Sequence, residues 1–138
     1  MPLTLTLTEG VIPAGTEQQV IQKITDSMLK WHGLNGNKVM TPNVTASVHV
    51  LPRGTTFSGG KEISAAWVEW KTPSFAFAEE DIQKGFFDDA TTIIHELSNE
   101  KLPRDKIYIN VVHTVDGAWN MNGRAMSNAE IGETISRG

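Results

Sequence analysis

The feature that most constrains the fold is a strand, a helix and a second strand in succession, a pattern that occurs twice along this chain. In the first half, strict alternation of leucine and threonine over Leu3–Thr8 predicts a half-buried strand. Apolar residues then recur at helical spacing over residues 20–31, and Thr16 with Gln19 predicts a capping box ahead of them. Alternation over Val44–Val50 predicts the second strand.

The second half of the chain repeats this plan without repeating the sequence. Ile63–Trp70 and Ile107–Val115 have the composition of strands, and Glu79–Asn99 has apolar residues at helical spacing. Pro103 lies between that helix and the last strand, where it can end the helix without disturbing the strand. The side chains expected to face inward from the helix are Ile82, Phe86, Ile93 and Leu97.

We expect these elements to form a single α+β domain over residues 1–138. A strand followed by a crossover helix returns parallel to itself and right-handed, so residues 1–52 and 57–115 predict two βαβ units. Such units can share a four-stranded sheet with both helices on one face, in a two-layer α/β arrangement. The ferredoxin-like fold also contains two strand-helix-strand units, with interleaved halves, and the pattern alone does not separate the two architectures.

Residues 116–138 predict a C-terminal hairpin and a short helix. Asn122-Gly123 is a strong hairpin signal, and the segment from Ser127 to Glu130 matches a capping box. Exposed Trp119 and Met121 on this hairpin could reach a neighbouring subunit, or they could pack back on their own sheet. The sequence leaves both possibilities open.

Composition excludes several classes of function. The net charge of −4 argues against nucleic acid as a partner, and no apolar run approaches a membrane span. Without cysteine there is no disulfide, and no signal-peptide pattern opens the chain, so we expect a soluble cytoplasmic protein. The histidines lack the spacing of metal ligands and are interpreted as surface or packing residues; they are His32, His49, His95 and His113.

The residue with the clearest chemical potential is Pro2. If Met1 is removed, the chain begins with a secondary amine at the head of a strand, which holds that amine in a fixed position. An α-amino group has a pKa of about 7.7–8.0 in water, and burial or a nearby cation lowers it toward neutrality, where general-base catalysis works best. If Met1 is retained, the nitrogen of Pro2 is an amide and has no basicity.

Several short motifs around this proline resemble the tautomerase superfamily. They are Val48-His49-Val50-Leu51-Pro52, Phe57-Ser58-Gly59-Gly60, Lys106-Ile107-Tyr108-Ile109-Asn110 and Asn122-Gly123. In order and spacing they are most similar to the long-chain branch that contains macrophage migration inhibitory factor and cis-3-chloroacrylic acid dehalogenase-like proteins, with 4-oxalocrotonate tautomerase as a further relative. The resemblance covers Pro2 to about Met126.

This resemblance implies a homotrimer of four-stranded sheets around a central channel, with each active site near a subunit boundary. It implies a cofactor-independent tautomerase that isomerises small carboxylate-bearing 2-oxo or enol acids, with Pro2 as the general base. Tyr108 and Asn110 match the residues that line the pocket of the cytokine-like members, and their two-residue spacing puts both on one sheet face. By position alone, further substrate contacts would come from Lys71, Thr72, Trp119 and Met121.

The chain also departs from the family pattern. The lysine that the cytokine-like branch carries before its second strand aligns with Thr41, so Lys38 or Lys71 is the expected carboxylate partner, with Arg53 and Arg124 as alternative anion clamps. The paired arginines of the dehalogenase-like branch are missing after the third strand. Hydration, dehalogenation or decarboxylation of a three-carbon acid is therefore the alternative reaction, and a non-catalytic trimeric interaction protein is the alternative role.

Overall fold

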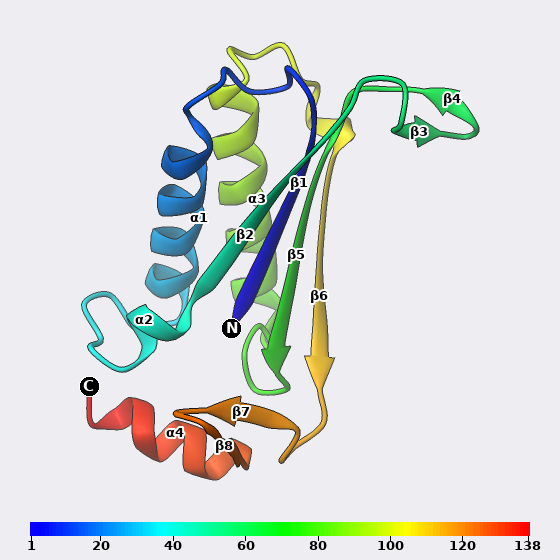
Figure 1. Ribbon diagram of the computed structural model, residues 1–138. Coiled ribbons are helices and arrows are strands. Elements are labelled where there is room, and N and C mark those ends of the chain that lie inside the picture. The colour runs from blue at the N-terminus through cyan, green and yellow to red at the C-terminus, as the bar shows by residue number, and fades with distance from the viewer.

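The computed structural model describes all 138 residues as one sheet covered by two helices, with two small hairpins at its ends (Figure 1). The elements are β1 (Pro2–Thr8), α1 (Glu17–Trp31), α2 (Met40–Asn43), β2 (Thr45–Leu51), β3 (Phe57–Ser58), β4 (Lys61–Glu62), β5 (Ala66–Pro73), α3 (Glu80–Leu97), the 3₁₀ helix η1 (Arg104–Lys106), β6 (Ile107–Thr114), β7 (Trp119–Met121), β8 (Arg124–Met126) and α4 (Asn128–Ser136). None of these helices is long and apolar enough to cross a lipid bilayer.

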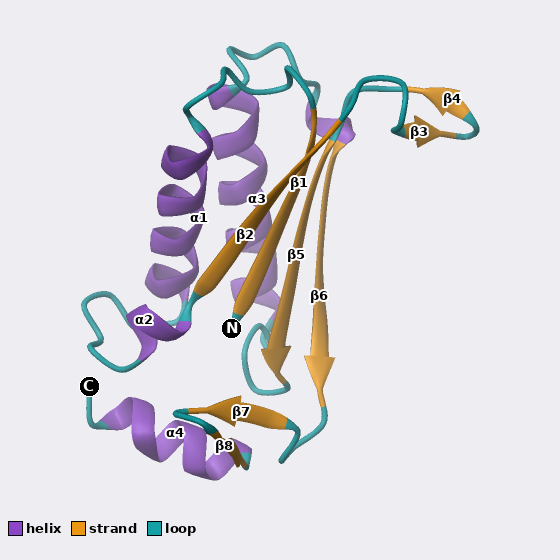
Figure 2. Cartoon of the chain, in the orientation of Figure 1, coloured by secondary structure: helices purple, strands orange, loops and turns teal.

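The main sheet has the strand order β2-β1-β5-β6. β1 is parallel to β2, β5 is parallel to β6, and the two pairs meet antiparallel between β1 and β5. The two βαβ units therefore lie side by side without interleaving, which separates this fold from the ferredoxin-like alternative. Both long helices, α1 and α3, cover the same face of the sheet (Figure 2). The predicted two-layer α+β architecture is confirmed.

The core lies between the sheet and these two helices. Leu5 of β1 is 0% exposed, and Trp70 of β5 packs against Phe86 of α3 with the ring centroids 6.0 Å apart. Burying one such side chain contributes about 1.5–3 kcal/mol relative to leaving it in water. The helices approach closely where Gly85 of α3 lies against Trp31 of α1, and a Cβ atom on Gly85 would come within 2.2 Å of that ring. Glycine is required there because the indole occupies the space of a side chain.

Several local predictions are corrected. Thr16 begins α1, but its hydroxyl donates to the carbonyl of Pro13 and makes no capping bond to the helix, so the predicted capping box with Gln19 is absent. The third strand begins at Ala66 rather than Ile63 and continues to Pro73. In α3, Ile93 was expected to face the core, but it is only half-buried. Its neighbour Ile94 is fully buried instead.

The turn-rich segment between α1 and β2 contains the short helix α2, which was not predicted. Asn37 lies before its first turn, and the side-chain oxygen of Asn37 accepts hydrogen bonds from the backbone N–H groups of Val39 (3.0 Å) and Met40 (2.7 Å). Its Met40 side chain is 0% exposed, which fixes α2 against the core. α2 ends at Asn43, and Val44 separates it from β2.

Both hairpins form around the predicted glycine turns. Gly59-Gly60 joins β3 to β4 in an arm that projects from the end of the sheet (Figure 1). Asn122 (φ 54°) and Gly123 (φ 80°) both have positive φ, as a type I′ turn between β7 and β8 requires. Met121 is only 3% exposed, so of the two possibilities that the sequence left open, this side chain packs back on its own chain.

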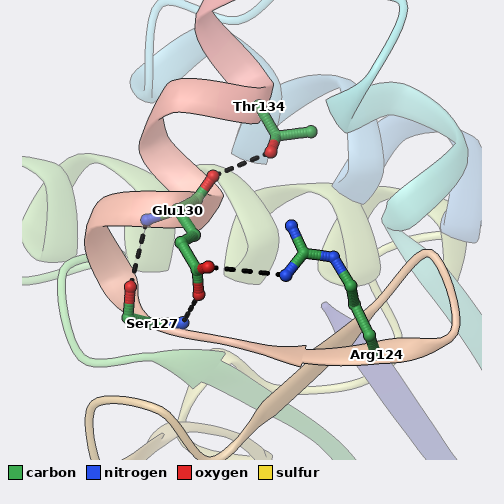
Figure 3. A network of polar contacts seen from close by, with 4 residues as sticks. All are labelled: Arg124, Ser127, Glu130 and Thr134. Carbon is green, nitrogen blue, oxygen red and sulfur yellow. Dashed lines mark hydrogen bonds and ion pairs between the residues drawn. The ribbon is translucent and has the colours of Figure 1, made fainter.

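The capping box at the start of α4 is present (Figure 3). The hydroxyl of Ser127 accepts from the backbone N–H of Glu130 (3.2 Å), and the Glu130 carboxylate accepts from the backbone N–H of Ser127 (2.8 Å). The second oxygen of that carboxylate pairs with Arg124 at 3.4 Å. These contacts lower the pKa of Glu130, led by the backbone hydrogen bond from Ser127.

Candidate functional site

Pro2 lies at the start of β1, a central strand, on the face of the sheet that the helices leave open. Pro2 is exposed and the following Leu3 is 1% exposed, because consecutive side chains of a strand point to opposite faces. The open face continues along β1 through Thr4 and Thr6, which are both half-buried. A strand between two neighbours holds its first residue more firmly than a free tail would.

Met1 precedes Pro2 in this structure and is buried, with 6% of its surface exposed. Its amino group donates to the backbone carbonyl of Asn43, and its own carbonyl accepts a hydrogen bond from the backbone N–H of Thr45 at 3.2 Å. Burial lowers the pKa of the Met1 amine from 8.0 to about 6, since desolvation disfavours the charged form. The backbone around the N-terminus is thus an environment that favours a neutral amine.

Lys71 is the cation that the sheet brings nearest to Pro2. The antiparallel register pairs Leu3 with Trp70, and its continuation by one residue sets Pro2 opposite Lys71. The Lys71 side chain is 60% exposed, and its amino group lies 4.0 Å from the Glu69 carboxylate, at the limit of an ion pair. Lys71 is therefore free to turn toward a ligand carboxylate beside Pro2.

Thr72 points away from this region. It is 0% exposed, lies on the helix-covered face, and its hydroxyl has no hydrogen-bond partner. The alternation of β5 puts neighbouring residues on opposite faces, so Lys71 and Thr72 cannot contact the same ligand. Only Lys71 of these two residues lies on the open face, and binding of a substrate by either residue stays a prediction.

Tyr108 and Asn110 share the open face, as their spacing predicted, but the chain keeps Tyr108 far from its own Pro2. Tyr108 pairs with Trp67 in the register of β5 and β6, and the two rings stack with centroids 5.9 Å apart. Trp67 in turn pairs with Thr6, four residues beyond Pro2. Four residues of strand span about 13 Å, so a single subunit does not bring Tyr108 and Pro2 together.

The remaining predicted site residues differ in position. Lys38 is exposed just before α2, and α2 and the C-terminal hairpin lie toward the same end of the sheet as the N-terminus (Figure 1). Trp119 on that hairpin is half-buried and Met121 is buried, so only Trp119 retains surface for a ligand. Arg124 is paired with Glu130, and Arg53 donates to the carbonyl of Glu9 at 3.3 Å.

A hollow of about 500 Å³ lies on the open face beyond Pro2. Its lining combines hydroxyl, carboxylate, amide and aromatic groups, from Thr4, Thr6, Leu51, Thr55, Thr56, Phe57, Trp67, Glu69 and Asn110. Glu69 and the threonines of β1 were not predicted as site residues. The signal was present, because alternation from Lys71 puts Glu69 on the same face two residues earlier.

The loop that follows β5 is held by two histidines. The backbone N–H of Phe77 donates to Nε2 of His32 at 3.1 Å, and Nε2 of His113 lies 2.7 Å from the carbonyl of Ala76. Burial lowers the pKa of His32, against the smaller raising effect of its hydrogen bond to the carbonyl of Met28. These histidines therefore have structural partners, and no group of three His, Asp or Glu side chains is arranged to hold a metal ion.

No protein-family model and no curated protein sequence matches this chain, whereas solved structures do. One is Pt0534 inactivated by 2-oxo-3-pentynoate, with 16% sequence identity and a TM-score of 0.76 over 96% of this chain and 99% of that one. Another is N1, a member of the cis-3-chloroacrylic acid dehalogenase family, with 13% identity and a TM-score of 0.76 over 96% of this chain and 88% of that one.

A third similar structure is a fused 4-OT described as a wild-type symmetric trimer. It has 9% identity and a TM-score of 0.76 over 96% of this chain and 99% of that one. In each case nearly the whole chain is covered, so the match includes both βαβ units and the C-terminal hairpin. The chain has the fold of the tautomerase superfamily, as the resemblance predicted.

Proposed function

We propose that this chain is a cofactor-independent tautomerase of small 2-oxo and enol acids, in which Pro2 acts as the general base after removal of Met1. The observation that carries the proposal is the position of Pro2, exposed at the head of a central strand on the open face of the sheet. The similar structures are enzymes of this fold, including a dehalogenase-family member and fused 4-OT. Their similarity to this chain supports an enzyme, and the choice of reaction rests on the site residues.

The proposed reaction needs a neutral amine. Pro2 itself is exposed, so a neighbouring cation is what would favour the neutral form of its amine after removal of Met1. In the reaction, Pro2 nitrogen takes a proton from carbon 3 of the 2-oxo acid. The C–H electron pair forms the C2–C3 double bond, and the carbonyl oxygen takes the negative charge. Pro2 then gives the proton to that oxygen, which completes the enol and restores the neutral amine, and the reverse sequence gives the ketone.

Lys71 is the proposed carboxylate partner. It lies on the same face as Pro2 in the neighbouring strand, and its contact with Glu69 is loose. Its positive charge would hold the substrate carboxylate and favour the neutral form of the amine. Dehalogenation is less well supported, because Arg53 and Arg124, the candidate second cations, already have partners.

We further propose that the active molecule is a homotrimer. A similar structure is described as a symmetric trimer, and Tyr108 lies too far from Pro2 to serve the same site within one subunit. The open face, with Val112 43% exposed and Tyr108 38% exposed, is the surface that such an assembly would cover. Tyr108 and Asn110 would then complete the pocket of a neighbouring copy.

Ketonisation of phenylenolpyruvate by the wild type and by Pro2→Ala tests this function. The intact mass is measured first, to establish that the wild type begins at Pro2. Loss of the fixed secondary amine is expected to reduce kcat/KM by about 10²-fold or more, the contribution of a general base. Lys71→Ala is expected to raise KM more than it lowers kcat. Equal rates for the wild type and Pro2→Ala would reject the proposal and favour a binding role.

A further inference from the structure

Met1 occupies the space through which any substrate must reach the amine of Pro2. In the full chain the nitrogen of Pro2 is bonded to the carbonyl carbon of Met1. When that bond is cleaved, the freed nitrogen carries a hydrogen and a lone pair on the side where Met1 lay. A proton on a substrate carbon must approach the nitrogen from this direction. The groups that contact Met1 are therefore the groups that would surround a substrate beside the Pro2 nitrogen.

Two backbone groups flank this space. The N–H of Thr45 donates to the carbonyl oxygen of Met1 at 3.2 Å, and the carbonyl of Asn43 accepts from the Met1 amine. Removal of Met1 leaves both groups without these partners. Thr45 is the first residue of β2 and pairs with Pro2, so its N–H stays beside the freed amine. A backbone N–H without a partner next to a reacting atom is a ready donor for an oxygen anion.

The third part of the space is apolar. The Met1 side chain belongs to the hydrophobic core and only 6% of the residue is exposed. Its removal opens a socket of methionine size that continues from the amine toward the core. An apolar group can fill such a socket at a gain, whereas a carboxylate would lose its hydration there without a charged partner.

We propose that the substrate takes the place of Met1, with its reacting oxygen on the Thr45 N–H and an apolar substituent of carbon 3 in the Met1 socket. This inference rests on the proposed function, whose substrate class it narrows to 2-oxo acids with an apolar group on carbon 3. The Thr45 N–H stabilises the enolate oxygen as charge develops. The Asn43 carbonyl accepts a hydrogen bond from an enol O–H and repels a second carboxylate.

The first test removes one backbone donor. Thr45→Pro deletes the N–H, and Thr45→Ala is the matched variant that keeps it while losing the same hydroxyl. Proline is compatible with this position, since it begins a strand and Val44 before it is already extended at φ −88° and ψ 96°. The kcat of Thr45→Pro for phenylenolpyruvate is expected to be about 10- to 100-fold below that of Thr45→Ala. Equal kcat values, or a difference in KM alone, would overturn the assignment.

The second test uses the wild-type chain, so it does not depend on the folding of a variant. Phenylenolpyruvate carries a phenyl group on carbon 3, and enol-oxaloacetate carries a carboxylate at the same carbon. The socket predicts a kcat/KM at least about tenfold higher for the phenyl substrate, each rate being corrected for its uncatalysed reaction. Equal values, or a preference for the dianion, would overturn the apolar socket.

The two proposals fail in different ways. If Pro2→Ala is as active as the wild type, the proposed function fails whatever Thr45 does. If Pro2→Ala is inactive but Thr45→Pro matches Thr45→Ala, Pro2 is the base and the substrate does not use the Met1 space as described. Both Thr45 variants are first compared with the wild type by circular dichroism and thermal unfolding.

Discussion

The two faces of the sheet differ sharply, although the same strands supply both. On one face, β1 presents Leu3, Leu5 and Leu7, which are 1%, 0% and 2% exposed beneath α1 and α3. On the other, the same strand presents Pro2 and threonines that no helix covers. The side chains of the covered face are buried by helices of the same chain. The open face leaves polar, aromatic and charged groups uncovered by the helices.

The comparison shows how the strand pattern separates stability from chemistry. Two adjacent residues of one strand point to opposite faces, so substitutions at these two positions affect different faces of the sheet. Positions on the covered face should control unfolding, and positions on the open face should control activity and assembly. The first prediction below tests this division directly, and the other two test buried contacts of the covered side, from the largest expected effect to the smallest.

The largest effect is expected from Leu5→Ala on the covered face. It should lower the free energy of unfolding by about 2–5 kcal/mol, because the deletion leaves a cavity in a site with 0% exposure. Thr6→Ala, the adjacent open-face control, should change it by only about 0.5 kcal/mol in a single subunit. Urea unfolding of both variants measures the difference. A loss above about 1 kcal/mol for Thr6→Ala would contradict this division between the two faces.

A smaller effect is expected from Gly85→Ala at the contact of the two helices. Alanine favours a helix over glycine by about 1 kcal/mol, yet its Cβ would lie 2.2 Å from the Trp31 ring. The clash should dominate and lower the free energy of unfolding by about 1–3 kcal/mol. Thermal unfolding checks the sign, with Gly132→Ala in α4 as the control, because a Cβ there meets nothing. Stabilisation by Gly85→Ala would contradict the close packing of α1 and α3.

The smallest effect concerns the N-terminus of a chain that retains Met1. Its amine has a pKa of about 6 when folded and 8.0 when unfolded, so the unfolded chain binds more protons between these values. Stability should therefore rise with pH from about 6 to 8, by less than about 1 kcal/mol in total, because the amine is partly exposed and solvent screens it. Unfolding is measured across this range beside an N-acetylated chain, which has no titrating amine. Equal pH slopes for both chains would contradict a buried amine.

Much of the fold was predictable because its signals are local. The Leu-Thr alternation of residues 3–8 specifies β1 and its covered face, and Asn122-Gly123 specifies the turn between β7 and β8. The capping box of Ser127 and Glu130 was also predicted correctly, since both hydrogen bonds form within four consecutive residues. At Thr16 a similar pattern failed, because its hydroxyl bonds to Pro13 instead.

The candidate site was less predictable because it depends on register and on contacts between distant segments. The sequence by itself determined that Tyr108 and Asn110 share one face of the sheet, since a two-residue period needs no tertiary information. Only the tertiary structure decided that Lys71 lies opposite Pro2 and that Asn43 and Thr45 flank the N-terminus. It also decided that Tyr108 lies four residues along the sheet from Pro2. Strand pairing joins residues more than 40 positions apart, and no local pattern encodes which residues it sets side by side.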